Sequence, residues 1–381
     1  MPIDINKVPS PAFVMEMKRL RENLELIQQV QTAAGVSIIL ALKGFAMWRV
    51  FPMVGRYLKG ATASSLAEAR LIFEEMGVRA HTYSPAYLPD EFDEILQYSS
   101  HITFNSIQQY ERYRSRLSTS AHVVSPGIRV NPEYSEVEVA LYNPAAPGSR
   151  LGEVVENFKG VLPEGLEGLH FHTLCESSSY DLEKVLNAFE RNFSAFFSQL
   201  KWVNFGGGHL MTRKGYDTQH LIQLLHAFRA RHPHLEVILE PGSAIAWETG
   251  VLVSSVLDII ENKGVKTAIV DVSFTAHMPD TLEMPYRPRI VGADAQPQPD
   301  KPAYRIGGVS CLAGDYMSEY SFEHAPKIGD RIIFEDMIHY TMVKTSTFNG
   351  VRHPAICIWH EDDTLEIVRK FGYEDYKNRL S

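Results

Sequence analysis

The chain has 381 residues, of which 22% are charged, and a formal net charge of −9. This length predicts a large core and two domains, and the lack of a basic patch argues against a nucleic-acid partner. We expect neither a signal peptide nor a membrane span, because no suitable apolar segment is present. Three cysteines without metal-ligand spacing (Cys175, Cys311 and Cys357) indicate no metal site and a reduced, cytoplasmic location.

Strand and helix patterns alternate between residues 36 and 240. A short strand at 12–15 and an amphipathic helix at 18–34 come first. Helices are then predicted at 46–58, 65–76, after Pro89-Asp90, and at 106–117, 152–158, 180–199 and 217–231. Strands are predicted at 36–43, 60–63, 80–84, 101–105, 122–130, 167–174, 201–206 and 235–240. Eight such units favour an α/β fold closed into a (β/α)8 TIM barrel over an open doubly wound sheet.

The texture of the sequence changes after Gly250. Short β-rich segments at 250–260, 265–273, 302–308, 330–335, 338–344 and 354–358 are separated by Gly, Pro and Asp turns. We therefore predict a C-terminal all-β domain at 248–381, a barrel domain at 21–247, and an N-terminal segment, 1–20, whose strand packs on the β domain. The loop 291–302 is predicted to be a mobile insertion.

Lys43 ends the largely apolar run from Ser37 to Gly44, which reads SIILALKG. A lysine at the tip of a buried strand is costly unless it pairs or reacts. Partial burial lowers the pKa of a lysine and frees its amine as a nucleophile that can form a Schiff base. A surface lysine that extends its amine into water is the alternative at this point.

Other polar residues fall at the C-terminal ends of predicted strands, where a TIM barrel carries its active site. They are Arg129, His172, the triplet Gly206-Gly207-Gly208, and Glu240 followed by Pro241-Gly242. Each has a structural alternative: a core histidine, a plain glycine turn, an acid at a helix start. Together with Lys43 they match the needs of pyridoxal phosphate, which requires a Schiff-base lysine, a phosphate cradle and a partner for the pyridine nitrogen.

The β-rich part offers weaker candidates. Cys311 is a proton donor or a buried small side chain. Asp271 and Asp315 bind a substrate ammonium or stabilise turns. Tyr340 reaches a phosphate or packs in a sheet. Arg289 binds a substrate carboxylate or lies solvated at the surface.

Six segments in order resemble one known family. ALKGF, FHTLCES, NFGGGH, LEPGSA, VSCLAGD and DMIHYT are similar to motifs of the fold-type III, alanine-racemase-like pyridoxal-phosphate decarboxylases, which include ornithine, arginine and diaminopimelate decarboxylases. The resemblance covers nearly the whole chain. It implies a barrel that binds pyridoxal phosphate, completed by a C-terminal β domain.

The resemblance also implies roles for individual residues. Lys43 would carry the cofactor, His172 would stack on its ring, and Glu240 would contact the pyridine nitrogen. Cys311 would lie near the reacting carbon, supplied by the second subunit of a head-to-tail homodimer with shared active sites. The remaining implied contacts are the phosphate (Gly206, Gly207, Gly208, Gly242 and Tyr340), the ring edge (Arg129) and the distal substrate amine (Asp271 and Asp315).

Departures from relatives narrow the substrate. Diaminopimelate decarboxylases usually carry an arginine where this chain has Ser243, and ornithine decarboxylases an aspartate where it has Thr62. The resemblance therefore favours decarboxylation of a small cationic amino acid, carboxynorspermidine or carboxyspermidine, to norspermidine or spermidine. Diaminopimelate or ornithine decarboxylation, a non-catalytic carrier of pyridoxal phosphate and a metal-dependent barrel enzyme are the alternatives.

Overall fold

The computed structural model describes residues 3–137 and 143–381, so part of the Pro-rich loop predicted at 131–150 lies outside it. The chain divides into a barrel unit, Asn23–Ile245, and a sheet unit, which combines the segment ending at Glu22 with Ala246–Ser381. Among the described residues, no helix has both the length and the apolar character needed to cross a membrane.

The barrel unit is a ring of parallel strands, as predicted. The sheet order is β2-β10-β9-β8-β7-β6-β5-β4-β3, and β2 and β3 are two pieces of the first predicted strand, so the sheet closes on itself. Ile39, between the two pieces, donates its N–H to Leu239. The strands are β2 (Ser37–Ile38), β3 (Leu40–Ala41), β4 (Ala61–Ala63), β5 (Ala80–Tyr83), β6 (Ser99–Phe104), β7 (Ser125–Arg129), β8 (Gly168–His170), β9 (Trp202–Asn204) and β10 (Glu236–Leu239).

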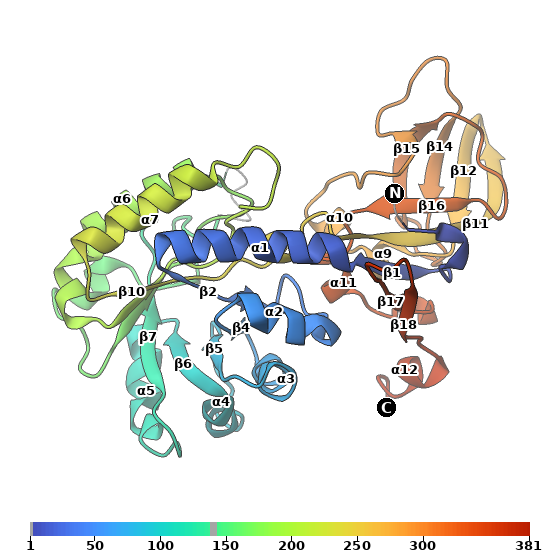
Figure 1. Cartoon of the computed structure of the whole chain (residues 1–381). Coiled ribbons are helices and arrows are strands. Elements are labelled where there is room, and N and C mark those ends of the chain that lie inside the picture. Colours follow the sequence, from blue (N-terminus) through green and yellow to red (C-terminus); the bar gives the residue numbers. More distant parts are fainter. Residues whose placement is uncertain (1–2, 138–142) are drawn as a thin grey trace. The chain divides into compact units, whose positions relative to one another are not determined.

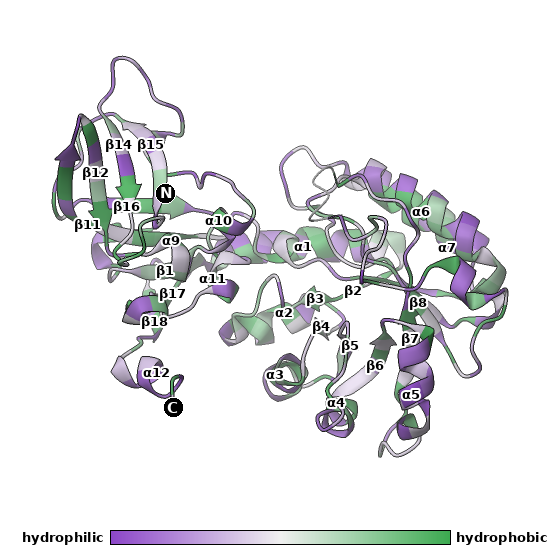
Figure 2. Cartoon of the chain, turned by 180° about the vertical axis from the view of Figure 1, so that it is seen from behind, coloured by the Kyte–Doolittle hydropathy of each residue, from purple (hydrophilic) through white to green (hydrophobic). Residues whose placement is uncertain are grey.

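Helices follow the strands and lie on their outer side, as α3, α4 and α5 do beside β4 to β7 in Figure 1. Helices α6 and α7 carry both hydrophilic and hydrophobic residues, which suits helices packed on one side (Figure 2). The helices up to the end of the barrel are α1 (Met17–Ala34), α2 (Phe51–Tyr57), α3 (Leu66–Met76), α4 (Phe92–Tyr98), α5 (Ile107–Leu117), α6 (Ser179–Phe193), α7 (Thr218–Arg231) and α8 (Ser243–Ala246).

Local signals set the helix starts with small differences from prediction. The Ser65 side chain caps α3 by accepting from the N–H of Glu68, while the Glu68 carboxylate accepts from the N–H of Ser64 at 2.6 Å. The predicted helices 46–58 and 180–199 each include a 3₁₀ turn, Trp48–Val50 and Ser194–Gln199. The predicted helix 152–158 is only a 3₁₀ turn, Val155–Phe158, because one short turn offers too few bonds to propagate.

Apolar packing fills the end of the barrel interior that is distant from the strand tips. Ile39, Trp202 and Ile238 form one buried cluster there. A Cβ atom on Gly168 would lie 2.0 Å from the Trp202 ring, and one on Gly127 would lie 2.3 Å from it. Glycine at these two inward positions therefore makes room for the indole.

The sheet unit holds nine strands in the order β13-β15-β14-β12-β11-β1-β17-β18, with β16 paired to β11. β1 (Ala12–Glu16) lies antiparallel to β11 and parallel to β17, which confirms that the N-terminal strand joins the β domain. The other strands are β11 (Gly250–Asn262), β12 (Val265–Val270), β13 (Ala293–Asp294), β14 (Ala303–Gly307), β15 (Tyr316–Phe322), β16 (Arg331–Glu335), β17 (Ala355–Trp359) and β18 (Leu365–Arg369).

Prediction was weaker in the sheet unit. The strand predicted at 338–344 is wrong, because Thr341–Lys344 forms the short helix α11, and strands β15 and β18 were not predicted. The loop 291–302 contains β13, which pairs with β15. The remaining short helices are α9 (Phe274–His277), α10 (Asp280–Glu283) and α12 (Tyr373–Lys377).

Candidate active site

The C-terminal rim of the barrel brings together the residues that the sequence predicted there. Lys43 follows β3, Arg129 ends β7, and His172 lies two residues beyond β8. Glu240 directly follows β10, and the glycine triplet 206–208 comes just after β9. Because all strands of the ring are parallel, these positions share one end of the barrel.

Hydrogen bonds at His172 fix which of its ring nitrogens faces Lys43. The N–H of Gly207 donates to Nδ1 of His172 at 2.7 Å, so Nδ1 presents a lone pair and a neutral imidazole carries its proton on Nε2. Nε2 lies 3.1 Å from Nζ of Lys43. In this tautomer Nε2–H can donate to Nζ of Lys43 when the amine is neutral.

The electrostatics around Lys43 point the same way. The side chain is open to solvent yet closely surrounded by protein, as in a recess. Burial lowers the pKa of Lys43, and the nearby charge of Arg129 lowers it further, against an opposing effect of Glu240. Burial likewise holds the pKa of His172 well below its usual range. Both shifts favour the uncharged forms, so the rim brings a lysine amine with a lowered pKa next to an imidazole with a lowered pKa.

Arg129 anchors the segment that follows β8. Its Nη2 donates to the carbonyl oxygen of His172 at 2.9 Å, and its guanidinium lies 4.9 Å from the centre of the Tyr83 ring. The Tyr83 hydroxyl in turn donates to Asn105 at 2.8 Å. Arg129 is 4% exposed, so these contacts hold the charge in a largely buried position that fixes the His172 backbone.

Glu240 is a buried carboxylate with two partners inside the barrel. Asn204 donates to Oε1 at 2.7 Å, and Nε2 of His170 lies 3.4 Å from Oε2. Burial alone would raise the pKa of Glu240, but His170 and Asn204 outweigh it and lower the pKa to about 2. Burial lowers the pKa of His170. Glu240 is therefore ionised at neutral pH and can hold a proton on a ring nitrogen.

The glycine triplet is fitted closely against its surroundings. A Cβ on Gly207 would lie 2.4 Å from the carbonyl oxygen of Glu240, and one on Gly208 would lie 2.3 Å from that of Leu174. Gly206 and Gly208 also have φ of +66° and +90°, which favour glycine. Nearby, a Cβ on Gly44 would lie 2.8 Å from the Cα of Gly242.

Not every N–H of the triplet is free for a ligand. The N–H of Gly206 donates to Asn204, and that of Gly207 donates to His172. Within residues 3–137 and 143–381, the N–H groups of Gly208 and Gly242 have no hydrogen-bond acceptor. These two are the donors that remain for an anion such as a phosphate.

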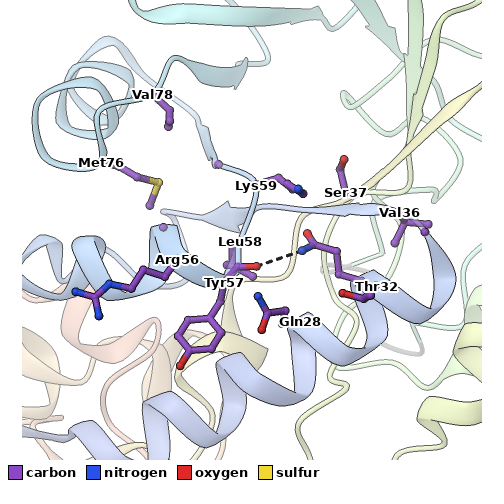
Figure 3. Close-up of a pocket in the computed structure, with 14 residues that line it drawn as sticks. Gln28, Thr32, Val36, Ser37, Arg56, Tyr57, Leu58, Lys59, Met76 and Val78 are labelled. Atoms are coloured by element: carbon purple, nitrogen blue, oxygen red, sulfur yellow. Dashed lines mark hydrogen bonds between the residues drawn. The ribbon is translucent and has the colours of Figure 1, made fainter.

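A hollow of the barrel unit lies at the opposite ends of the strands. It has a volume of about 680 Å³ and is lined by Gln28 and Thr32 of α1, by Ser37 at the start of β2 and by Lys59. Figure 3 shows the Arg56 side chain pointing away from Gln28. Since Lys43 follows the other end of this strand, the hollow is separate from the predicted active site.

The two carboxylates that were predicted to bind substrate, Asp271 and Asp315, accept hydrogen bonds from neighbouring residues of the sheet unit. Asp315 is 4% exposed and accepts from the backbone and hydroxyl groups of Ser310 and Thr275, at 2.6 to 3.3 Å. A Cβ on Gly308 would lie 2.3 Å from its carboxylate. Asp271 accepts from Ser10 at 2.6 Å and from the N–H of Ser255 at 2.9 Å.

The other candidates of the sheet unit are more exposed or more strained. Arg289 pairs with Glu248 at 2.7 Å and with Glu335 at 3.5 Å, so its guanidinium already has carboxylate partners. Cys311 is exposed. Tyr340 has φ 45° and ψ −59°, a strained conformation of the kind found at functional sites.

Three residues of the barrel rim were not singled out from the sequence. Tyr83, His170 and Asn204 line the interior beneath the predicted residues. His170 and Asn204 each lie two positions before a predicted rim residue, where alternation along a strand points the side chain to the same side. A polar residue at that spacing in an apolar strand was the available signal.

Comparison with known proteins places this geometry in a family. The family model of pyridoxal-dependent decarboxylases, described by its C-terminal sheet domain, matches residues 13–338. A carboxyaminopropylagmatine decarboxylase from Synechocystis is 52% identical, over 99% of this chain and 96% of its own length. A carboxynorspermidine/carboxyspermidine decarboxylase from Campylobacter jejuni is 44% identical, over 98% and 99%.

Solved structures agree with the fold. Carboxynorspermidine decarboxylase from Campylobacter jejuni, complexed with norspermidine, has a TM-score of 0.89 and 43% identity, over 98% of this chain and all of the other. Diaminopimelate decarboxylase from Helicobacter pylori has a TM-score of 0.82 at 17% identity, over 98% and 97%, which shows the shared fold alone.

Proposed function

Because this chain belongs to the pyridoxal-dependent decarboxylases, we propose that it removes the α-carboxylate of a carboxylated polyamine with pyridoxal phosphate bound at the barrel rim. The observation that carries the proposal is the position of the Lys43 amine, 3.1 Å from His172 and on the same rim as the ionised Glu240, where burial lowers the pKa of the lysine. A nucleophilic amine and a buried carboxylate are the two groups that this cofactor requires of its protein.

Two kinds of substrate are consistent with the comparisons. Carboxynorspermidine and carboxyspermidine end in a primary ammonium, and relatives at 44% and 37% identity are named for them. Carboxyaminopropylagmatine ends in a guanidinium, and the relative at 52% identity is named for it. All three carry the same α-amino acid end, so the chemistry at Lys43 is shared and only the contacts of the distal cation differ.

Residues of this chain perform separate tasks in the proposed reaction. Lys43 would hold the cofactor through its amine, whose lowered pKa favours the free, nucleophilic form. His172 offers a flat face for a pyridine ring, and its orientation is fixed from both sides by the N–H of Gly207 and by Arg129, which binds its carbonyl oxygen. Glu240, as a buried ionised carboxylate, would hold a proton on the pyridine nitrogen of the bound cofactor.

Pyridoxal phosphate, when bound, supplies an electron sink for the charge left on the α-carbon after carbon dioxide departs. The N–H groups of Gly208 and Gly242 support the proposed phosphate contact, since both lack acceptors among the described residues. The phosphate contact predicted for Tyr340 stays a proposal.

We keep the following as proposals. Cys311 protonates the α-carbon from the second subunit of a homodimer, and the protein acts in the cytoplasm. Asp271, Asp315 and Arg289 keep their predicted substrate roles as hypotheses that gain no support here, because internal partners already satisfy all three.

The activity is tested by adding pyridoxal phosphate and each of the three carboxylated polyamines separately, then measuring carbon dioxide release and product mass. We expect one product lighter by one carbon dioxide for at least one of them. Absence of release with all three, in protein that shows the visible absorbance of bound cofactor, would refute the proposed activity. Release from diaminopimelate or ornithine instead would reassign the substrate within the family.

A competition experiment separates the two substrate types. Equal concentrations of carboxyaminopropylagmatine and carboxyspermidine, which share the same four-carbon spacer before the distal cation, are mixed, and the two products are followed by mass. A site that holds a planar guanidinium through paired hydrogen bonds discriminates strongly against an ammonium, whereas one methylene changes binding by only about 1–3 kcal/mol. A large ratio therefore identifies the distal group, and a ratio near one shows that this group is not recognised.

A further inference from the structure

His170 is a buried histidine of the barrel interior with no assigned role. It ends β8, its side chain is 3% exposed, and Nε2 lies 3.4 Å from Oε2 of Glu240. Neither ring nitrogen makes a hydrogen bond within the described residues. Buried polar atoms are nearly always satisfied in native proteins, so an exception at an active site calls for an explanation.

The surroundings of His170 offer it one acceptor. The Tyr83 ring meets it edge-on at 5.5 Å between centroids, and the neighbouring ionisable groups are the bases Arg129 and Lys43 and the carboxylate of Glu240. TIM-barrel interiors are usually filled by branched apolar side chains. A histidine here, directly beside the one buried carboxylate among these neighbours, therefore requires a reason other than packing.

We propose that His170 is a positioning residue for Glu240, whose Nε2–H and the amide of Asn204 together hold the carboxylate in one orientation toward the pyridine nitrogen of the cofactor. A small rotation of the carboxylate brings the 3.4 Å separation into hydrogen-bonding range. This inference rests on the proposed function, because it requires that pyridoxal phosphate bind at the rim.

The geometry explains why two partners are used. An ionised carboxylate has about four lone-pair positions. Asn204 occupies one on Oε1, and His170 faces the other oxygen, Oε2. Fixing both oxygens prevents rotation and leaves the remaining lone pairs for a ring N–H. With only Asn204, burial would favour a neutral or misdirected carboxyl group.

The first test compares His170→Leu, which removes the donor, with His170→Gln, which places an amide near the Nε2 position. We expect His170→Leu to weaken pyridoxal phosphate binding and lower kcat by about tenfold to a hundredfold, as for other outer groups that orient a ligand, with little change in KM. His170→Gln should restore both quantities to within about threefold of wild type. The matched control is His101→Leu, because His101 stacks on His81 at 3.8 Å and makes no ion pair with Glu240 among the described residues.

A double-mutant cycle separates positioning from structure. If His170 acts through Glu240, then His170→Leu added to Glu240→Gln should change cofactor affinity by less than about twofold. Additive effects of the two substitutions on cofactor affinity would overturn the proposal. It would also be overturned if His170→Leu bound pyridoxal phosphate with wild-type affinity and the bound cofactor showed the wild-type pH dependence of its absorbance.

Two further outcomes are decisive. If His170→Leu fails to fold, His170→Gln is compared with His170→Asn, whose shorter amide reaches only the Nδ1 position; equal cofactor affinity would overturn the proposal. Affinity for pyridoxal phosphate is measured without substrate. Wild-type protein that does not bind it would refute the proposed function, whereas binding that is insensitive to His170 would refute this inference alone.

Discussion

The rim of the barrel and the loops of the sheet unit were both predicted to carry site residues, and they differ in how those residues are used. At the rim, Nζ of Lys43 lies 3.1 Å from Nε2 of His172, and the buried Glu240 accepts a hydrogen bond from Asn204. In the sheet unit, Asp315 and Arg289 are each engaged by neighbouring groups of their own fold. A closed barrel gathers strand ends whatever their distance in sequence, whereas a loop carboxylate near a motif can simply hold the loop.

The largest effect should come from Lys43, the proposed nucleophile of the rim. Lys43→Met removes the nucleophile, so turnover should fall by about 10³-fold or more, with loss of the visible absorbance of bound cofactor. The same substitution should raise the melting temperature of the cofactor-free protein. The pKa of Lys43 is lowered in the folded state, so the unfolded chain binds the proton more tightly and folding loses stability as the pH falls below the ordinary lysine pKa.

The control for Lys43 is Lys59→Met, since Lys59 lines the hollow at the other end of the barrel. It should leave turnover and absorbance unchanged. Retention of turnover by Lys43→Met would contradict the assignment of the nucleophile. A lower melting temperature for that variant would contradict the burial argument while leaving the nucleophile in place.

Asp315 should show the opposite pattern, with loss of stability. Asp315→Ala leaves the donors of Ser310 and Thr275 unsatisfied in a buried position, so the free energy of unfolding should fall by about 3 kcal/mol. Urea unfolding measures this loss, and Asp300→Ala, at an exposed position, should change it by less than about 0.5 kcal/mol. A stable Asp315→Ala variant with a raised KM would instead restore the predicted substrate contact.

The sequence was most informative where topology and chemistry coincide. Alternation predicted the eight-stranded barrel, and the parallel strands then placed Lys43, Arg129, His172 and Glu240 at one end. The sequence did not reveal that the N–H of Gly207 donates to His172, because backbone hydrogen bonds depend on loop geometry that residue types do not encode. Tyr83, His170 and Asn204 were not predicted either, because a single polar residue inside a strand forms no recognisable sequence motif.

Gly207 should give the next largest effect at the rim. Its added Cβ would lie 2.4 Å from a backbone oxygen, which cannot move as a flexible side chain can, so Gly207→Ala should displace the loop and weaken cofactor binding by about tenfold to a hundredfold. Titration with pyridoxal phosphate measures the affinity. The matched control is Gly55→Ala in helix α2, where the added Cβ would contact only Met76, at 3.7 Å. This substitution should stabilise the protein by about 0.5–1 kcal/mol, because alanine favours a helix more than glycine does.

The sheet unit also shows why element type was harder to predict there. The segment 338–344 has the β-branched and aromatic residues of a strand, yet Asp336 and Tyr340 take positive φ and turn the chain into α11. Tertiary context overrode propensity at this point. The positive φ of Asp336 and Tyr340, which composition does not encode, is what separates this segment from a strand.

Arg289 should give the smallest effect and so marks the limit of the comparison. Its side chain is 60% exposed, and its ion pairs with Glu248 and Glu335 are screened by solvent. Arg289→Gln should therefore lower the free energy of unfolding by less than about 1 kcal/mol and leave KM for the carboxylated polyamine unchanged. Glu335→Gln removes one of its partners and serves as the matched variant, with an equally small expected change in stability. A KM raised by about tenfold in Arg289→Gln but not in Glu335→Gln would show that Arg289 leaves its carboxylate partners to bind substrate, and the sheet unit would then supply a charged group to the reaction as the barrel rim does.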